Sequence, residues 1–405
     1  MATVRPFTAH MPPGDRAAAI ASVPYDVVNS AEAAGLAEGN PDSFLHVIRP
    51  EIDMPSGTDL YSAPVYAQAE AALADFFARI PYTEHAGTLL VYRLVRDGRP
   101  QIGVVGACSV DEYDDGRIAI HERTRPAKED DRTRHVVTMA CQAEPIFLAY
   151  RRDEAIDALV ESAMAAAPLY DFVAADGVAH TVWTAPDPRA LSAAFEAVPL
   201  LYVADGHHRA KSASRARETF RARRGDAHRG DEAYNFVMSV VFPDNQLEIL
   251  PYNRVVTDLG GRSPTDLLSS IRDRFGLEPN AAASPSARGR FSVYADGAWH
   301  AFSIPAPGTS VVGDLDCALL QDHVLAPMLG IEDPRRDPRI DFVGGIRGTE
   351  ELERRADSAG GVAFSLYATS MAELFAVADA GEIMPPKSTW FEPKLRSGLF
   401  VHRIA

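Results

Sequence analysis

The stretch that decides the fold is LLYVADGHHR, residues 200–209. Its first residues, LLYVA, are apolar and predict a buried strand, and Asp205-Gly206 predicts a tight turn. A helical pattern follows from about His208 to Arg223. A strand that passes through a glycine turn into a helix gathers backbone N–H groups at the positive end of the helix dipole. This arrangement attracts phosphate.

The side chains of the turn extend that prediction. Gly206 allows the backbone to approach a ligand closely, and His207, His208 and Arg209 offer hydrogen-bond donors suited to phosphate oxygens. The structural alternative is that Asp205 only caps the helix while the histidines lie on the surface. Two histidines and an arginine beside one glycine favour the functional interpretation.

Composition narrows the class of protein. The chain has 405 residues, enough for two or three domains, and a formal net charge of -16 from 40 basic and 56 acidic residues. Such an acidic chain is repelled by nucleic acids and anionic membranes, so neither is an expected partner. The three cysteines are far apart, and no apolar run has membrane-spanning length or the form of a leader. We therefore expect a cytoplasmic enzyme.

Helices and strands alternate on both sides of the opening stretch. Apolar periodicity and breaker residues predict further helices at 61–80, 132–142, 154–166, 188–198, 264–275 and 315–329. The same criteria predict strands at 88–93, 101–110, 117–120, 145–150, 180–184, 235–242, 247–256, 289–294 and 299–304. The sequence thus predicts a mixed α/β (α+β) fold.

A second polar segment, HERTRPAKEDDR, occupies residues 121–132 directly after a short predicted strand. Active-site groups often gather at strand ends, and Glu122 there is suited to take a proton from a hydroxyl group or to hold Mg²⁺. His121, Thr124 and Lys128 are candidate substrate or phosphate ligands from the same segment. The alternative interpretation is a solvated charged loop.

A third segment, MPPKSTWFEPKLRSG at residues 384–398, has no helical or strand period. Lys387, Ser388, Thr389 and Lys394 are suited to an anionic substrate or to phosphates. Packing of Trp390 and Phe391 as a C-terminal strap is the alternative, and both interpretations are compatible.

Several common classes are excluded by motif. The sequence contains no GxxxxGK[ST], no HRD or DFG set, no GxSxG and no GxGxxG after a strand. Adjacent residues on a helix point about 100° apart, so His207 and His208 are poorly placed to chelate one metal ion. No HxxxH or HExxH spacing occurs.

The VADGHHRAKSA stretch, residues 203–213, resembles the phosphate-binding signature of the ParB/sulfiredoxin superfamily. Within that superfamily, free serine kinases carry the Asp-Gly-His-His-Arg turn that stands here at 205–209. Those kinases also have a His-Glu loop, a helix and a Pro-Ile strand before the turn. His121-Glu122 and Pro145-Ile146 follow the same order here, although residues 151–198 lie between the strand and the turn.

The whole chain resembles a second family, domain of unknown function 1015, nearly from end to end. The motifs that carry this resemblance are Arg5-Pro6-Phe7, Pro24-Tyr25-Asp26-Val27-Val28, Asn40-Pro41, His121-Glu122-Arg123-Thr124, Ala204 to Arg209 and Met384 to Lys394. The region 22–55 lacks a chemical interpretation from sequence.

The resemblance to the kinases implies a ParB/sulfiredoxin-like nucleotide-binding core at 116–245, with α+β additions at 1–115 and 246–405. It implies phosphoryl transfer from ATP or ADP to the hydroxyl of free L-serine or a similar amino acid. Glu122 would be the general base, Asp205 would position substrate or Mg²⁺, and residues 206–209 would hold the phosphates. His208 is also assigned a catalytic role, and Mg²⁺ would bind through the phosphates or at Glu122 or Asp205.

Two rival classes remain. The first is a nucleotide-binding regulator without acceptor turnover, as in superfamily members that use this pocket as a nucleotide switch. The second is sulfiredoxin-like or nuclease-like chemistry, but the position of a reactive cysteine beside the arginine is held here by His207 or His208. The acceptor, the donor nucleotide and the oligomeric state are left open by the sequence.

Overall fold

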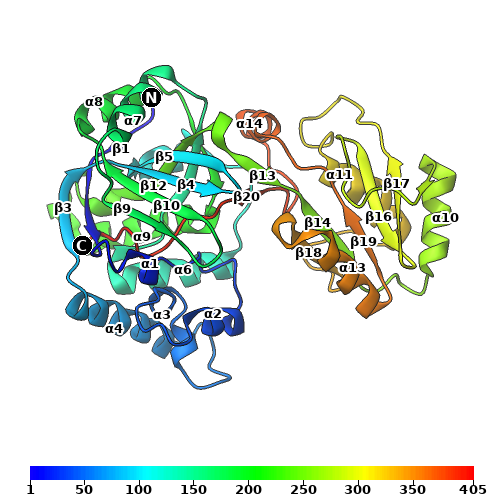
Figure 1. Ribbon diagram of the computed structural model, residues 1–405, viewed down its shortest axis with the longest axis horizontal. Helices are drawn as coiled ribbons and strands as arrows, with labels where there is room; N and C mark the ends of the chain where they lie inside the picture. The colour runs from blue at the N-terminus through cyan, green and yellow to red at the C-terminus, as the bar shows by residue number, and fades with distance from the viewer. The chain divides into compact units, whose positions relative to one another are not determined.

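The structure is a computed structural model that describes residues 1–405, and it contains both helices and β-sheets (Figure 1). The prediction of a mixed α/β fold is therefore confirmed. The chain forms two compact units. Unit 1 consists of residues 1–120, 124–247 and 393–405, and unit 2 consists of residues 121–123 and 248–392.

The main sheet of unit 1 is nine-stranded and mixed, with the order β6-β11-β8-β12-β5-β4-β10-β9 and with β1 paired to β5. Its strands are β1 (Val4–Arg5), β4 (Leu90–Arg96), β5 (Arg99–Ser109), β6 (Ile118–Ala119), β8 (Ile146–Tyr150), β9 (Tyr170–Val173), β10 (Ala179–Thr184), β11 (Leu201–Asp205) and β12 (Phe236–Pro243). The sheet takes strands from both sides of residue 115, where the sequence predicts a boundary between regions. That division into three regions stays a prediction.

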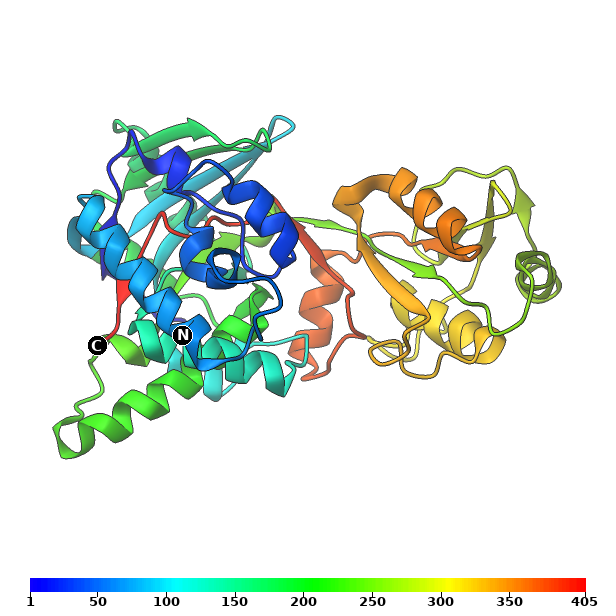
Figure 2. The ribbon, with the colours of Figure 1, turned by 90° about the horizontal axis from the view of Figure 1, so that it is seen from below.

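Two shorter strand pairs complete the β-structure of unit 1. They are β2 (Phe7–Met11) with β3 (Thr83–Thr88), and β7 (Cys141–Gln142) with β21 (His402–Arg403). The helices of this unit are α1 (Ala17–Ile20), α2 (Ser30–Ala37), α3 (Leu45–Ile48), α4 (Ala63–Arg79), α5 (Val110–Asp114), α6 (Pro126–Met139), α7 (Glu154–Met164), α8 (Pro188–Phe195) and α9 (His207–Arg224). Helices α6 and α9 pack side by side (Figure 2).

The core of unit 1 follows from the alternation of side chains along β8. Ile146, Leu148 and Tyr150 point to one face, where they share a buried cluster with apolar residues of α7, α8 and α9. Phe147 points to the other face, with its ring centroid 4.6 Å from that of Phe242. Side chains of this size each stabilise the fold by about 1.5–3 kcal/mol when buried, so both faces of the central strands contribute to the core.

The C-terminal segment, residues 393–405, belongs to unit 1 and follows the last residue of unit 2. The Gly398 N–H donates to the Ala143 carbonyl at 3.1 Å, and the ring of Phe400 lies 5.5 Å from that of Tyr92. Residues 393–402 are all buried. The predicted strap was attributed to Trp390 and Phe391, of which Phe391 is buried and Trp390 is half-buried.

Unit 2 contains a six-stranded antiparallel sheet in the order β15-β17-β16-β19-β14-β18. These strands are β14 (Tyr252–Val256), β15 (Glu278–Pro279), β16 (Arg290–Ala295), β17 (Ala298–Ser303), β18 (Ile340–Gly344) and β19 (Val362–Ser365). A separate antiparallel pair joins β13 (Glu248–Leu250) to β20 (Trp390–Glu392). The helices are α10 (Pro264–Phe275), α11 (Asp316–Leu320), α12 (Ala326–Leu329), α13 (Gly348–Ala359) and α14 (Met371–Asp379).

Helix α13 closes the core of unit 2 over the sheet. Its Leu352 and Ala356 are buried with Val255 of β14 and Ala363 of β19. The helix predicted at 315–329 is not a single α-helix, because a π-helical turn at Gln321–Leu325 separates α11 from α12. π-helical turns are frequent at functional sites, and this one lines a cavity described below.

Three further expectations need correction. Helix α6 begins at Pro126 instead of near 132, because proline suits the first helical position and the charged residues after it are good helix formers. Most of the segment 121–132 is therefore helix, not loop. Strand β9 was not predicted, because it lies at the sheet edge with a mixed burial pattern. The predicted strand at 247–256 is divided into β13 and β14.

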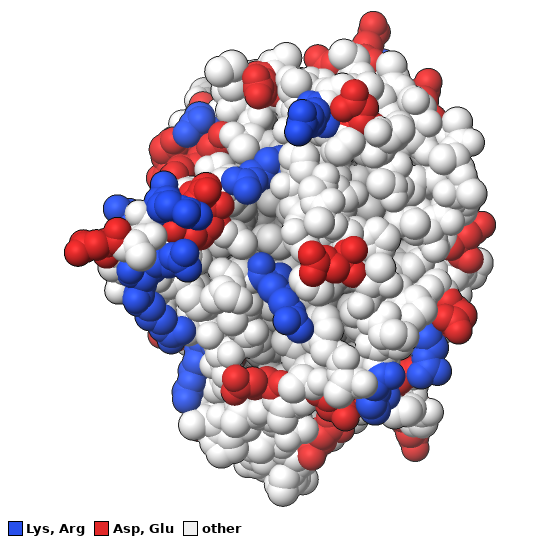
Figure 3. All heavy atoms as spheres, turned by 90° about the vertical axis from the view of Figure 1, so that its left-hand side faces the viewer, with Lys and Arg blue, Asp and Glu red and all other residues white.

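The surface carries both signs of charge. Figure 3 shows one face on which acidic and basic side chains are interspersed among uncharged ones, with some basic groups gathered along one margin. That face is not the continuous basic surface that follows a nucleic-acid backbone. None of the helices combines the length and the apolar character needed to cross a lipid bilayer.

Candidate phosphate-binding site

The predicted strand–turn–helix is present in unit 1. Strand β11 ends at Asp205, helix α9 begins at His207, and Gly206 alone lies between them. The φ angle of Gly206 is 92°, in the left-handed region, and a Cβ atom there would lie 3.0 Å from Cζ of Arg209. The turn therefore requires glycine for its conformation and for the close approach of the arginine.

The N-terminus of α9 has the electrostatic character of an anion site. The helix is 18 residues long and has no acidic residue in its first turn. The first N–H groups of any α-helix lack intrahelical acceptors, and the helix dipole adds partial positive charge at the same end. A phosphate placed beside Gly206 would accept hydrogen bonds from such groups.

Asp205 is held between two cations. Its Oδ1 lies 3.1 Å from the ammonium of Lys394, and its Oδ2 accepts a 2.9 Å hydrogen bond from Nη2 of Arg209. Burial alone raises the pKa of Asp205, but Lys394 and Arg209 outweigh burial and hold that pKa well below its ordinary value. Asp205 is therefore ionised at neutral pH, and it fixes both cations beside the turn.

Arg209 faces inward. Its side chain is 8% exposed, and Nη1 donates to the Pro145 carbonyl at 2.6 Å. Burial lowers the pKa of Arg209, but the carboxylates of Asp26 and Asp205 reverse this effect and raise it above the ordinary value. This arginine ties the start of α9 to the chain just before β8. Its direct contact with phosphate stays a prediction.

The two histidines have different surroundings. His207 is 5% exposed, and burial lowers its pKa to about 4, so its imidazole is neutral at pH 7. Nε2 of His208 accepts a 3.0 Å hydrogen bond from the N–H of Arg125. An acceptor Nε2 places the proton of a neutral imidazole on Nδ1. His208 thus connects the first turn of α9 to the start of α6.

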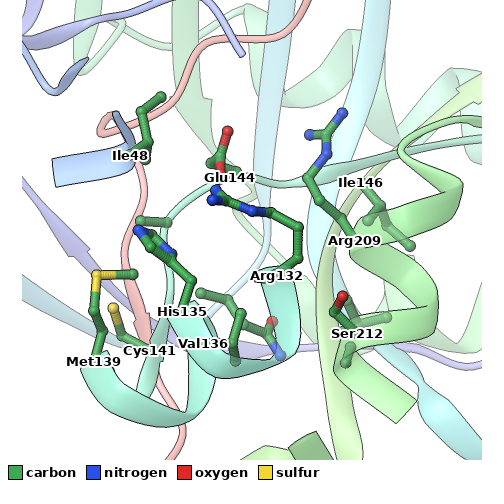
Figure 4. Close-up of a pocket in the computed structure, with 14 residues that line it drawn as sticks. Ile48, Arg132, His135, Val136, Met139, Cys141, Glu144, Ile146, Arg209 and Ser212 are labelled. Carbon is green, nitrogen blue, oxygen red and sulfur yellow. Dashed lines mark ion pairs between the residues drawn. The ribbon is translucent and has the colours of Figure 1, made fainter. Parts of the chain in front are cut away.

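Below the turn lies a cluster of buried charges. Nη2 of Arg132 is 2.9 Å from Asp131, and Nη1 is 3.9 Å from Glu144 (Figure 4). The guanidinium of Arg132 also lies 4.2 Å from the ring centroid of Tyr25, whose N–H donates to Glu144 at 3.1 Å. Burial raises the pKa of Glu144 in spite of Arg209 and Arg132. Perturbed ionisable groups of this kind concentrate at functional sites.

A cavity of about 30 Å³ lies within this cluster, lined by Arg132, Glu144 and Arg209 among others. A cavity of this size holds water, not a nucleotide. The cluster therefore packs against Arg209 of the turn, and its cavity is too small for a nucleotide.

These supporting residues were missed as site residues at the sequence level. Tyr25 and Asp26 belong to the Pro24-Tyr25-Asp26 motif, which the sequence marked without explaining. Glu144 directly precedes the Pro145-Ile146 strand, and Arg132 ends the polar segment 121–132, but neither is among the predicted site residues. The available signal was the presence of charged residues within otherwise apolar surroundings, as in the segment Ala143-Glu144-Pro145.

The other predicted residues of unit 1 make contacts of their own. Thr124 donates its hydroxyl proton to Glu129, and the ammonium of Lys128 lies 5.7 Å from the ring centroid of Tyr61. These contacts show no connection to Asp205. Lys394 of the predicted tail contacts Asp205 of the turn.

The remaining predicted residues belong to unit 2, where His121 and Thr389 meet. Nε2 of His121 is 3.2 Å from Oγ1 of Thr389, and the His121 carbonyl accepts a 2.9 Å hydrogen bond from the N–H of Met384. The Ser388 hydroxyl donates to Pro385 at 2.7 Å, and the ammonium of Lys387 lies 5.3 Å from the Tyr252 ring centroid. Glu122, half-buried, is in this unit as well.

A protein-bound metal does not fit the turn. Both carboxylate oxygens of Asp205 already contact cations, and across residues 1–405 no group of three His, Cys, Asp or Glu side chains is arranged to hold a metal ion. A divalent cation at Asp205 would have to displace Lys394 or Arg209. Asp205 is therefore unsuited to be a primary Mg²⁺ ligand.

Replacement of Gly206 by alanine tests the turn. We expect the Gly206→Ala variant to lose about 1–2 kcal/mol of stability, because φ of 92° is strained for a residue with a Cβ atom. Thermal unfolding measures this loss. The matched control is Gly35→Ala in α2, where a Cβ meets nothing within 4 Å and helix propensity favours alanine. An equal change in stability in the two variants would contradict the assigned role of Gly206.

Comparison with solved structures found distant likenesses. A free serine kinase in complex with AMP is 11% identical, with a TM-score of 0.37, over 73% of this chain and 91% of that one. A conserved hypothetical protein from Pyrococcus furiosus is 12% identical, with a TM-score of 0.37, over 74% and 95%. SbnI from Staphylococcus aureus, truncated at its C-terminus, is 12% identical, with a TM-score of 0.38, over 72% and 85%. Likeness at this level does not assign an activity.

No curated protein matches the chain. The family described as "Protein of unknown function (DUF1015)" matches residues 4–318, which confirms the resemblance for the motifs within those residues; the motif at 384–394 lies outside the match. Residues 4–318 include β11, Gly206 and the whole of α9. The chain belongs to the DUF1015 family.

Proposed function

We propose that unit 1 binds the phosphate groups of ATP or ADP at the N-terminus of α9. We propose further that the protein is a phosphotransferase that transfers a phosphoryl group to the hydroxyl of free L-serine or a similar amino acid. The observation that carries the proposal is the turn at Gly206, where a left-handed glycine joins β11 to an 18-residue helix. This arrangement is a general solution for phosphate binding.

The charges beside the turn support an anionic ligand. Lys394 and Arg209 both contact the carboxylate of Asp205, so two cationic side chains lie beside the turn. Lys394 is buried and comes from a segment 189 residues away in sequence. Burying an ammonium group is costly, and this cost is consistent with a role at a binding site.

The resemblance to free serine kinases assigns Glu122 as general base, and this assignment rests on the sequence pattern alone. Its carboxylate would accept the proton of the acceptor hydroxyl while the hydroxyl oxygen forms a bond to phosphorus. The bond between phosphorus and the leaving phosphate oxygen breaks, and the nucleotide departs one phosphate shorter. Asp205 would act through Lys394 and Arg209 by positioning them, and His208 would hold the start of α6 beside the turn.

Mg²⁺ is proposed as a companion of the nucleotide phosphates. The contacts of Asp205 leave no place for the metal on that carboxylate. When bound to the nucleotide, Mg²⁺ neutralises charge on the transferred group.

The proposal is tested by incubating the protein with ATP or ADP, Mg²⁺ and a panel of hydroxyl-bearing amino acids. Mass spectrometry of the small molecules would then detect a phosphorylated amino acid. Nucleotide binding without any phosphorylated product across the panel would favour a nucleotide-binding regulator and overturn the phosphotransferase. Absence of nucleotide binding would overturn both.

Arg209→Ala is expected to weaken ADP binding. The substitution removes the hydrogen bonds to Pro145 and Asp205 and thereby loosens the first turn of α9. The loss of a charged hydrogen bond corresponds to roughly a 10- to 100-fold increase in Kd, measured by isothermal titration calorimetry.

Arg189→Ala is the matched control for this experiment, because Arg189 is exposed on α8. It removes the same charge from the protein without changing the turn. An unchanged Kd for ADP in a folded Arg209→Ala variant would contradict the placement of the nucleotide at this turn.

A further inference from the structure

Unit 2 contains a cavity of about 260 Å³ that the proposed phosphate site does not use. It is bounded by Arg254 of β14, Gln321 of the π-helical turn, the loop Glu332 to Arg335, and Pro385-Pro386. Water occupies about 30 Å³ per molecule in the liquid, so the space suits a ligand about the size of a small amino acid. It is smaller than the usual pocket for a nucleotide or another large cofactor.

Arg254 gives the cavity a buried positive charge. The residue is 3% exposed, and its guanidinium donates to the carbonyls of Tyr252 and Pro386. No carboxylate of the protein forms an ion pair with it, and burial lowers its pKa. Backbone carbonyls do not neutralise a guanidinium, so an uncompensated buried charge remains at the wall of the cavity.

Gln321 supplies an unused acceptor. Its Nε2 donates to the Ile331 carbonyl at 2.7 Å, and its Oε1 is buried without a hydrogen-bond partner. This contact with Ile331 fixes the orientation of the amide. A buried acceptor without a donor costs free energy, and a ligand with an N–H or O–H group would remove that cost.

The remaining charges of the cavity are one ion pair and one further carboxylate. Asp333 accepts two hydrogen bonds from Arg335, at 2.8 and 3.0 Å, so this pair is internally neutralised. Glu332 is exposed and adds a carboxylate to the lining. The cavity thus combines a buried cation with a neutral acceptor and an accessible anion.

We propose that this cavity binds a free α-amino acid as its zwitterion. The ligand carboxylate would pair with Arg254, whose guanidinium has more N–H donors than the two carbonyls use. The ligand ammonium would donate to Oε1 of Gln321 and face the carboxylate of Glu332. The proposal concerns only the cavity in unit 2 and does not depend on the proposed phosphoryl transfer.

The test is isothermal titration calorimetry of the full chain with glycine, L-alanine and L-serine as probes. We expect at least one of them to bind at millimolar concentration or below. Propionate and ethanolamine are expected to bind at least tenfold more weakly, because each lacks one of the two charges. Equal or tighter binding of propionate or ethanolamine would overturn the zwitterion assignment, as would a failure of all three amino acids to bind.

Substitutions in the cavity wall test whether the amino acid binds in this cavity. Arg254→Gln should weaken amino-acid binding at least tenfold while ADP binding stays unchanged, which separates this site from the turn in unit 1. Glu332→Gln changes an exposed residue and should weaken amino-acid binding without affecting the fold, so it serves if Arg254→Gln does not fold. Glu350→Gln, exposed on α13, is the control. Unchanged amino-acid affinity in folded Arg254→Gln, or in Glu332→Gln, places the ligand elsewhere and overturns the proposal.

Discussion

Glu122→Gln is expected to lower kcat for amino-acid phosphorylation by about 100- to 10,000-fold, which is the usual contribution of a general base. Glutamine keeps the size and most contacts of glutamate but cannot accept the proton of the acceptor hydroxyl. The Kd for ADP should stay within about twofold of the wild-type value, because the proposed base acts on the acceptor and not on the phosphates. Steady-state kinetics and calorimetry on the same preparation measure the two quantities.

The control for this substitution is Glu350→Gln, which removes an exposed carboxylate of unit 2. A Glu122→Asp variant adds a second test, since a shorter side chain retains the basic group and should keep part of the rate. If Glu122→Gln turns over at the wild-type rate, the general base is another residue. If the variant loses ADP binding instead, Glu122 serves the nucleotide and not the acceptor.

Asp205→Asn is expected to destabilise unit 1 by about 3–5 kcal/mol at neutral pH. The substitution leaves Lys394 and Arg209 without their shared counter-ion, and unpaired buried charges have costs of this order. Because the two units need not unfold together, hydrogen exchange of peptides that span β11 and α9 is the suitable measurement. Asp226→Asn, which changes an exposed carboxyl group, is the control.

The stability of unit 1 should depend on pH because the pKa of Asp205 is lowered in the folded protein. The unfolded-state pKa is about 3.9, and the folded-state value lies well below it. The stabilising contribution of the carboxylate is therefore complete above about pH 4 and is lost as the pH falls through the folded-state pKa. The difference in the free energy of unfolding of unit 1 between wild type and Asp205→Asn should be constant near neutral pH. It should become smaller only at acidic pH. A constant difference down to strongly acidic pH would contradict the ion-pair explanation.

Local features of the fold were predictable because local residues determine them. Helix α10 has the predicted bounds, since Ser263 and Asp266 form a capping box, Pro264 begins the helix and Gly276 follows it. The turn at Gly206 was predictable for the same reason. Helix α6 was assigned too short, because its first half is charged and gives no apolar period.

Non-local features of the candidate site were not predictable. The sequence marks Lys394 as a cation, but nothing local indicates that it pairs with Asp205, 189 residues earlier. The contact between Arg132 and Tyr25 likewise depends on how α6 packs against the N-terminal region. Tertiary packing determines contacts of this kind. The periodicity of residues along a single helix or strand therefore cannot predict them.

The C-terminal segment also determines when the contacts of Asp205 and His121 can be completed during translation. Asp205 and α9 leave the ribosome long before Lys394, and His121 leaves it before Met384 and Thr389. Until those residues emerge, Asp205 lacks its contact with Lys394, and His121 lacks its contacts with Met384 and Thr389. A nascent chain therefore carries both candidate stretches in an incomplete state, and synthesis of the last part of the sequence completes them almost together.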